Sequence, residues 1–351
     1  MKKFEPNYQN ITDAANNKEA KRLPLYEHII CIEHMEEVLD AKFKDLIDGS
    51  DSDKLEYFRK YCEFFKAMGY DTVSFEQCIG AVMPGGGALG GHADPVIKTR
   101  EDFDKYPWDE IPELYFKHYT RDFEALRKAM PIGMKAIGGV GNGIFECVQE
   151  IVGYMNLCFI QADDPDLYAD LFSAVGRTNC TIWDRFVREF GDIYCVLRFG
   201  DDMGHKSNLL IPPDDVRNHM LPQYKKIVQL VHDSGKPFLL HSCGCIFDVM
   251  DDIIDGAGID AKHSNEDQIA PFPAWVEKYG SRIGNFGGID TDAVCRLDEA
   301  SMTEYIHEVI AKSEGHGGFA FGSGNSIPDY VPLDKYRHMV ETVRRYRGDY
   351  R

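Results

Sequence analysis

A histidine and two cysteines lie within five consecutive residues of the chain, in the segment His241-Ser242-Cys243-Gly244-Cys245. Imidazole nitrogen and thiolate sulfur both bind zinc well, because zinc is an ion of borderline softness. Residues i and i+2 of a strand point to the same face, so His241 and Cys243 can reach one ion together. The alternative is a buried histidine and a buried free cysteine without a metal, since free cysteine often serves as a small core residue.

The residues on either side of this segment predict a turn between a strand and a helix. Residues 236–240 form a short apolar run that is typical of a buried strand. Residues 246–254 carry apolar side chains at helical spacing. We therefore expect the ligand-type side chains to lie where a buried strand ends.

Eight apolar segments along the chain predict strands, and predicted helices alternate with them. The predicted strands are residues 23–30, 70–79, 131–140, 195–199, 237–242, 258–263, 282–289 and 318–322. This alternation indicates parallel strands that are joined by helical crossovers. Eight such units predict an α/β fold of the (β/α)8 TIM-barrel type. A doubly wound open sheet is the second choice, because a sequence pattern does not prove that a barrel closes.

The chain shows no linker rich in proline, serine or charge that would divide it. We expect a short N-terminal lead-in at residues 1–22 and a single barrel domain at residues 23–351. The lead-in is polar and lacks the apolar core of a signal peptide.

Composition and charge exclude several classes of protein. The formal net charge of -19 argues against a nucleic-acid-binding protein, which needs a basic face for phosphates. No apolar run approaches the roughly 18 residues of a membrane span, so we expect no membrane insertion. The 10 cysteines show no disulfide-framework spacing. Free thiols of this kind fit the reducing cytoplasm, and we expect a cytoplasmic protein.

Polar side chains gather at the C-terminal ends of the predicted strands, where a barrel places its active site. Any single one of them can instead be a satisfied polar residue of the core or of a loop. Asp201 and Asp202 also suit a turn. The set consists of Glu27, His28, Glu76, Asn142, Asp201, Asp202, His241, Cys243, His263, Asp290 and Asn325.

Four segments of the chain resemble the uroporphyrinogen decarboxylase superfamily, and within it the corrinoid-dependent methyltransferase branch. The resemblance covers most of the chain after about residue 23, and it implies the same (β/α)8 barrel. The segments are Arg198-Phe199-Gly200-Asp201-Asp202, Leu221-Pro222-Gln223-Tyr224-Lys225-Lys226, His241-Ser242-Cys243-Gly244 and Phe321-Gly322-Ser323-Gly324-Asn325-Ser326-Ile327-Pro328.

The segment at residues 25–34, around the end of the first predicted strand, distinguishes the two branches of the superfamily. In the decarboxylases an arginine-rich segment there holds the propionates of the tetrapyrrole. Here residues 25–34 contain no arginine and two glutamates. These acids would repel a substrate with many carboxylates. The resemblance therefore favours the methyltransferase branch.

The methyltransferase branch holds zinc with a His-x-Cys pair and a later cysteine. His241 and Cys243 match the pair, but Asn325 stands where the later cysteine is expected. A neutral amide is a poor zinc ligand beside a thiolate. We expect Glu76 to complete the metal site, with Cys245 and His263 as alternatives.

The resemblance implies transfer of a methyl group between a small methylated substrate, or a thiol or folate acceptor, and a corrinoid (cobalamin). The corrinoid would be carried by a partner protein, and zinc would act as a Lewis acid. The resemblance also allows a homodimer. We expect Asp202, His263 or Asp290 to handle protons, and the substrate-binding residues to be Glu27, His28, Asn142 and Asn325. The alternatives are a uroporphyrinogen-type decarboxylase and a metal-free ligand-binding barrel.

Overall fold

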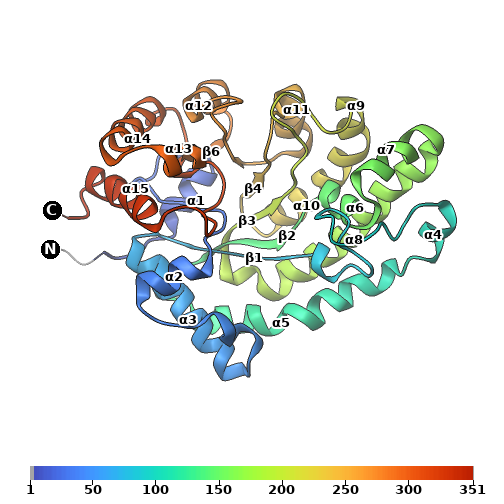
Figure 1. Cartoon of the computed structure of the whole chain (residues 1–351), viewed down its shortest axis with the longest axis horizontal. Helices are drawn as coiled ribbons and strands as arrows, with labels where there is room; N and C mark the ends of the chain where they lie inside the picture. The colour runs from blue at the N-terminus through green and yellow to red at the C-terminus, as the bar shows by residue number, and fades with distance from the viewer. Residues whose placement is uncertain (1–3, 351) are drawn as a thin grey trace.

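The computed structural model describes residues 4–350, which form one α/β unit around a single curled sheet (Figure 1). Every pair of neighbouring strands is parallel, and each strand pairs with the next one along the chain. A doubly wound sheet would reverse this order, so the alternative fold is excluded. The strands are β1 (Val73–Cys78), β2 (Ala136–Gly141), β3 (Tyr194–Gly200), β4 (Phe238–His241), β5 (Ala261–His263), β6 (Gly284–Ile289) and β7 (Phe319–Ser323).

The prediction of a regular strand at residues 23–30 is wrong. This segment forms only isolated bridges, from Leu25 to Phe321 and from Ile30 to Ile327. The N–H of Tyr26 donates to Phe321 O at 2.8 Å, and the N–H of Phe321 donates to Pro24 O at 2.9 Å. On the β1 side, the bond comes from a side chain: Ser74 Oγ donates to His28 O at 2.8 Å. Pro24 has no N–H to offer a ladder. The segment fills the eighth position of the barrel without becoming a strand.

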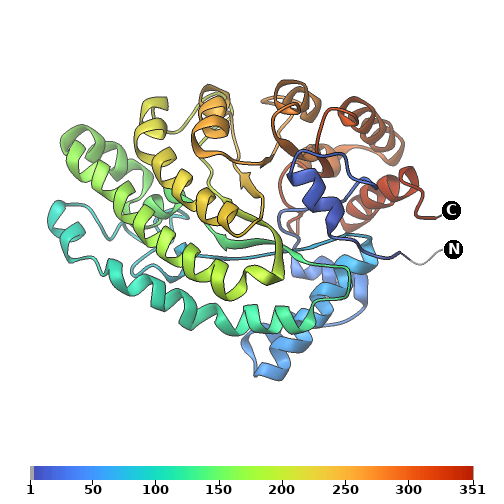
Figure 2. The same cartoon turned by 180° about the vertical axis from the view of Figure 1, so that it is seen from behind.

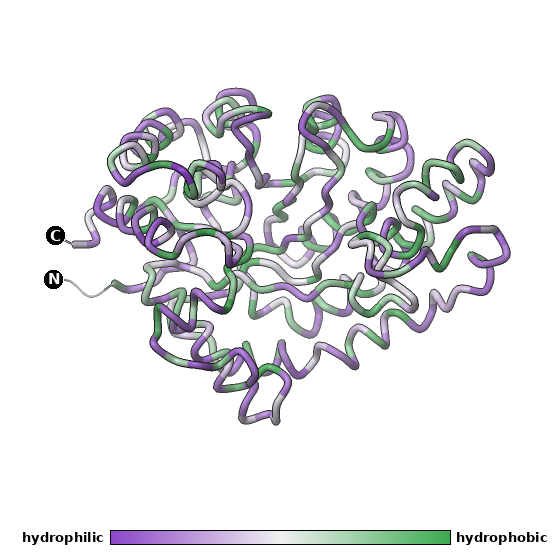
Figure 3. The backbone as a smooth tube through the Cα atoms, in the orientation of Figure 1, coloured by the Kyte–Doolittle hydropathy of each residue, from purple (hydrophilic) through white to green (hydrophobic). Residues whose placement is uncertain are grey.

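Helices follow the strands and cover the outer face of the sheet, and Figure 2 shows the long helices α5 and α8 side by side there. In Figure 3 hydrophilic and hydrophobic residues alternate along the helices, as expected when one face of a helix is buried. Within residues 4–350, no helix is both long and apolar enough to cross a membrane. The helices are α1 (Gln9–Ala15), α2 (Ile32–Leu39), α3 (Asp51–Met68), α4 (Arg100–Lys105), α5 (Ile111–Ala129), α6 (Ile144–Val152), α7 (Tyr154–Asp163), α8 (Pro165–Phe190), α9 (Pro213–Asp215), α10 (Leu221–Asp233), α11 (Phe247–Asp252), α12 (Phe272–Tyr279), α13 (Thr291–Arg296), α14 (Glu299–Ser313) and α15 (Leu333–Tyr346).

The described part of the N-terminal lead-in covers one end of the barrel. Ile11, Ala14 and Ala15 of α1 are fully buried. They pack in one cluster with residues from the beginning of the strands, Ile137, Val196, Leu239, Ala261, Phe286 and Ala320. The apolar end of the barrel interior is thus closed by α1, and the polar side chains lie toward the opposite end.

Candidate active site

Two histidines meet at the ends of adjacent strands. His241 is the last residue of β4 and His263 is the last residue of β5, and the two are partners in the parallel register. Their side chains therefore point to the same side of the sheet. The Nδ1 atoms of the two rings lie 2.7 Å apart, and both side chains are buried.

Cys243 and Asp202 lie on the far side of the His241 ring. Cys243 Sγ is 3.4 Å from His241 Nε2, and Asp202 Oδ1 is 3.7 Å from the same nitrogen. Asp202 Oδ1 also accepts the N–H of Cys243 at 2.8 Å. Gly244 has a φ of 84° and packs against the backbone of Gly204, so the turn after Cys243 needs a glycine. Three ligand-type side chains from the ends of β3 and β4 therefore converge.

The geometry of this donor set suits zinc. The ligand atoms of Asp202, His241 and Cys243 all lie within 4.8 Å of one another. Tetrahedral zinc with ordinary bond lengths separates its sulfur, nitrogen and oxygen ligands by roughly 3.3–3.6 Å. The separations of 3.4 and 3.7 Å at His241 Nε2 are close to these values. Three protein ligands with one open position are also typical of a catalytic zinc site.

A second group of candidate ligands, His28, His241 and His263, is less suitable for a metal. The rings of His28 and His241 are stacked, with centroids 3.9 Å apart and an interplanar angle of 15°. Ring nitrogens bind metals in the plane of the ring, so the lone pairs of stacked rings run parallel and do not converge. The Nδ1 of His28 is buried and has no hydrogen-bond partner among the described residues.

Asn325 lies directly beside the sulfur of Cys243. Its Nδ2 is 3.2 Å from Cys243 Sγ, and the hydroxyl of Ser264 is 3.7 Å from the same atom. Burial and the nearby Asp202 raise the pKa of the Cys243 thiol when no metal is bound. A bound metal ion reverses this effect, because it favours the thiolate.

Glu76 lies outside this donor set. Its Oε2 accepts two hydrogen bonds from Arg198, at 2.7 Å from Nη2 and 3.0 Å from Nε. Arg198 is fully buried and also donates to Tyr26 and Ser74. Glu76 Oε1 is 3.8 Å from His28 Nε2. The carboxylate that accompanies His241 and Cys243 is therefore that of Asp202.

Glu27 holds the end of β7 in place. Its Oε1 accepts the N–H of Ser323 at 2.9 Å, and its Oε2 accepts the Ser323 hydroxyl at 2.5 Å. Burial raises the pKa of Glu27 to about 8, although the bonds from Ser323 oppose the shift. Glu27 thus contacts the loop that carries Asn325.

Asp290 and Asn142 are both engaged in hydrogen bonds to nearby loops or helices. Asp290 caps α13 by accepting the N–H of Asp292 at 2.7 Å, and its other oxygen accepts the N–H of Asp267, in the loop after β5, at 2.7 Å. Asn142 has a φ of 60° and donates to Glu146 at 2.8 Å. Their predicted roles, proton handling for Asp290 and substrate binding for Asn142, stay predictions.

Glu146, in the first turn of α6, is not among the residues predicted from the sequence. Asp201 accepts the N–H groups of Phe145 and Glu146 at 3.0 and 2.8 Å, and the Tyr224 hydroxyl at 2.5 Å. Burial, together with Asp201 and Asp202, raises the pKa of Glu146. A charged residue in the otherwise apolar start of a helix is the signal that could have identified it.

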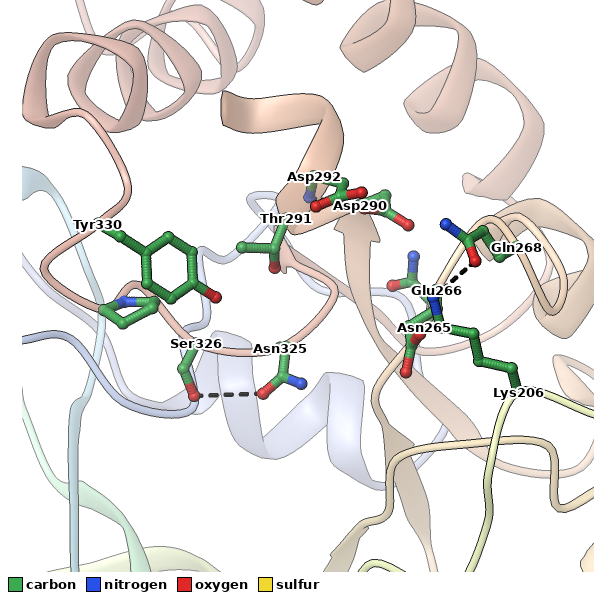
Figure 4. A pocket seen from close by; sticks show the side chains of 11 residues that line it. Lys206, Asn265, Glu266, Gln268, Asp290, Thr291, Asp292, Asn325, Ser326 and Tyr330 are labelled. Atoms are coloured by element: carbon green, nitrogen blue, oxygen red, sulfur yellow. Dashed lines mark hydrogen bonds between the residues drawn. The ribbon is translucent and has the colours of Figure 1, made fainter. Parts of the chain in front are cut away.

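A pocket of about 400 Å³ opens beside Asn325 at the ends of β5, β6 and β7 (Figure 4). It carries three carboxylates and one lysine. Asn325 connects it to the donor set, because the same side chain contacts Cys243. The pocket is lined by Lys206, Asn265, Glu266, Gln268, Asp290, Thr291, Asp292, Asn325, Ser326, Pro328 and Tyr330.

Residues 61–346 match the family described as uroporphyrinogen decarboxylase (URO-D), which is more than half of the 351 residues. The chain belongs to the uroporphyrinogen decarboxylase family. The family resemblance seen in the sequence is thereby confirmed. No curated protein sequence matches the chain significantly.

Solved structures share the fold of this family member at low sequence identity. A methyltransferase from Methanosarcina mazei has a TM-score of 0.71 and 14% identity, and covers 97% of this chain and 99% of its own. A putative vitamin-B12 independent methionine synthase from Listeria monocytogenes has a TM-score of 0.52 and 12% identity, and covers 93% and 99%. These similarities confirm the barrel-type α/β fold.

Proposed function

We propose that this member of the uroporphyrinogen decarboxylase family is a methyltransferase. It would move a methyl group between a small methylated substrate, or a thiol or folate acceptor, and a corrinoid carried by a partner protein. The observation that carries this proposal is the convergence of Asp202, His241 and Cys243 at the strand ends, beside an open pocket. The fold shared with a methyltransferase from Methanosarcina mazei supports it.

Zinc held by Asp202, His241 and Cys243 would supply a Lewis acid that lowers the pKa of a thiol or polarises the leaving heteroatom. Asn325 would donate an N–H to the sulfur of Cys243 and so stabilise its thiolate form. The N–H of Cys243 keeps the Asp202 carboxylate turned toward His241. The neighbouring pocket would hold the methylated substrate or the acceptor.

The charges of the pocket favour methyl transfer over decarboxylation of a tetrapyrrole. Glu266, Asp290 and Asp292 line it, and Lys206 is the single cation among its lining residues. Arg198 is engaged with Glu76 inside the barrel. A substrate with many carboxylates would therefore meet repulsion at this pocket.

The metal content of the purified protein tests the first half of the proposal. Protein prepared in zinc-supplemented medium is expected to carry about one equivalent of zinc through the three ligands. Cys243→Ala is expected to lose it. Cys245→Ala is the matched control, because this neighbouring cysteine lies outside the donor set, and it is expected to keep the metal. Protein without zinc would contradict the zinc mechanism and favour a metal-free ligand-binding barrel.

A spectroscopic assay of methyl transfer tests the second half. Free cob(I)alamin is mixed with methylated amines and aryl ethers, and methylcob(III)alamin with thiols, with and without candidate corrinoid proteins. The proposal expects a change of the corrinoid spectrum with at least one substrate, abolished in Cys243→Ala. No transfer with any of them, together with turnover of uroporphyrinogen, would favour the decarboxylase instead.

A further inference from the structure

A line of hydrogen bonds runs from the end of β7 to the donor set. Ser323 O lies 3.2 Å from His263 Nε2. His263 Nδ1 lies 2.7 Å from His241 Nδ1, and His241 Nε2 lies 3.4 Å from Cys243 Sγ. Each histidine thus uses both of its ring nitrogens, and the line joins three different strand ends.

The first member of this line determines where the protons lie. A backbone carbonyl can only accept a hydrogen bond, so the hydrogen between Ser323 and His263 belongs to His263 Nε2. A neutral imidazole carries a single N–H, which leaves Nδ1 of His263 as an acceptor. The hydrogen between the two rings must then belong to His241 Nδ1. His241 Nε2 is left with a free lone pair directed at Cys243 and Asp202.

The surroundings keep both rings neutral. His263 is completely buried and His241 is 4% exposed. A second proton would place a charge on a buried ring, and burial disfavours the charged form of an imidazole. An imidazolium in this place would also have to give its second N–H to His241 Nδ1, and that would put a hydrogen on the wrong nitrogen of His241.

Glu27 makes the carbonyl of Ser323 a fixed acceptor. The side chain of Glu27 is hydrogen-bonded to both the N–H and the hydroxyl of Ser323, at 2.9 and 2.5 Å. Tyr26, the residue before Glu27, packs edge-on against the ring of His263, with centroids 5.0 Å apart. The segment that fills the eighth position of the barrel therefore holds both the acceptor and the ring.

We propose that His263 is a positioning residue, which fixes His241 in the tautomer that carries hydrogen on Nδ1 and so keeps Nε2 free for a metal ion. The role as a metal-binding nitrogen rests on the function proposed above, whereas the tautomer does not. Partners of this kind behind a metal-binding histidine typically change metal affinity by about 10- to 100-fold.

Nitrogen NMR of the metal-free, full-length protein labelled with 15N-histidine measures the tautomer directly, without any substitution. At pH 7 we expect His241 to be protonated on Nδ1 alone and His263 to be protonated on Nε2 alone. His241 found with hydrogen on Nε2, or either ring found as imidazolium, would overturn it. The assignment uses the loss of signals in His241→Gln and His263→Asn.

Zinc affinity, measured by competition with a chromophoric chelator, tests the consequence. His263→Leu removes the acceptor, and we expect zinc affinity to fall by about 10- to 100-fold. His263→Asn offers an amide oxygen near the place of Nδ1 and is expected to recover most of the loss. Tyr26→Phe is the control: it breaks a hydrogen bond to Arg198 in the same cluster and should leave zinc affinity unchanged.

The two proposals fail in different ways. If the wild type binds no zinc but shows the expected tautomers, the zinc mechanism is contradicted and the positioning of His241 by His263 is supported. If the wild type binds zinc and a folded His263→Leu variant binds it with the same affinity, only the positioning role of His263 is contradicted. If His263→Leu does not fold, the NMR result and the zinc affinity of His263→Asn still test the positioning role of His263.

Discussion

Asn325 Nδ2 lies 3.2 Å from the sulfur of Cys243, so the amide occupies the place where the family resemblance puts a further thiolate. An amide N–H can donate to sulfur but cannot replace a thiolate as a ligand. Asp202 places the third ligand-type atom beside them, from the loop after β3. The candidate donor set thus offers one sulfur, one nitrogen and one oxygen, whereas the resemblance implied one nitrogen and two sulfurs.

Asn325→Cys should add a ligand to the proposed metal site. We expect zinc affinity to rise by at least about tenfold, because a second thiolate would complete a tetrahedral shell. Methyl transfer should become slower, because the open position is then filled. Chelator competition and the corrinoid assay measure the two effects. Asn325→Ala is the control, and equal affinity of the two variants would show that position 325 does not reach the metal.

Asp202→Asn tests which carboxylate belongs to the donor set. The amide oxygen can still accept the N–H of Cys243, so the turn should keep its shape. The negative charge is lost, and we expect zinc affinity to fall by about 10- to 100-fold, with little change in melting temperature. The measurement is chelator competition beside a thermal melt. An unchanged affinity would return the third ligand to Glu76, Cys245 or His263.

Glu76→Gln should have the opposite effect, a loss of stability without a loss of zinc affinity. Glu76 and Arg198 form a buried ion pair, with side chains 9% and 0% exposed. Removing one partner of a buried pair costs about 3–5 kcal/mol, because the other charge is left uncompensated. We therefore expect a large loss of unfolding free energy in urea, while the folded protein keeps its zinc affinity. A stable variant that has lost zinc would contradict this assignment.

The barrel could be predicted because it follows from local sequence patterns. Alternating apolar runs and amphipathic helices specify parallel strands, and the ends of such strands gather on one face. His241, Cys243, Asp202, His263 and Asn325 come together for this reason. The segment at residues 23–30 has an apolar pattern like the others, but its backbone pairs on one side only, which a local pattern does not reveal.

The partner of Glu76 could not be predicted in the same way. Arg198 lies 122 residues further along the chain, inside a strand whose other residues are mostly apolar. Which inward side chains meet depends on the register of the strands around the barrel. The same is true of Glu27 and Ser323, which are 296 residues apart. Strand ends follow from sequence periodicity, whereas contacts across the interior follow only from the assembled barrel.

Lys262 should make the stability of the protein depend on pH above neutrality. It is 3% exposed, its Nζ lies 3.7 Å from the centroid of the Trp275 ring, and burial lowers its pKa to about 7. The unfolded chain, with an ordinary lysine pKa near 10.5, therefore binds more protons between pH 7 and 10.5. Stability must rise with pH in this window, by at most about 1.4 kcal/mol per pH unit.

Urea unfolding at pH 7, 8 and 9 measures this effect in the wild type and in Lys262→Met. The variant lacks the titrating amine, so its unfolding free energy should rise less with pH than that of the wild type. Lys278→Met removes an exposed lysine from α12 and should keep the wild-type slope. Parallel curves for the wild type and Lys262→Met would show that Lys262 titrates normally in the folded state.

Gly322→Ala should weaken the contact that fills the eighth position of the barrel. A Cβ atom at Gly322 would overlap Tyr26 O and lie 3.2 Å from Glu27 Oε1. Tyr26 cannot withdraw freely, because its own N–H is bonded to Phe321 O. We expect a loss of at least about 1–3 kcal/mol of unfolding free energy in urea, the usual cost of overpacking.

Gly256→Ala is the matched control, because a Cβ there meets Leu221 at an ordinary 3.7 Å and should leave the unfolding free energy nearly unchanged. The same Gly322→Ala protein should also bind zinc more weakly, since Glu27 holds Ser323 and Ser323 faces His263. A variant as stable as the wild type would show that residues 24–27 do not pack tightly on β7. The acceptor for His263 would then lack the support that the structure gives it.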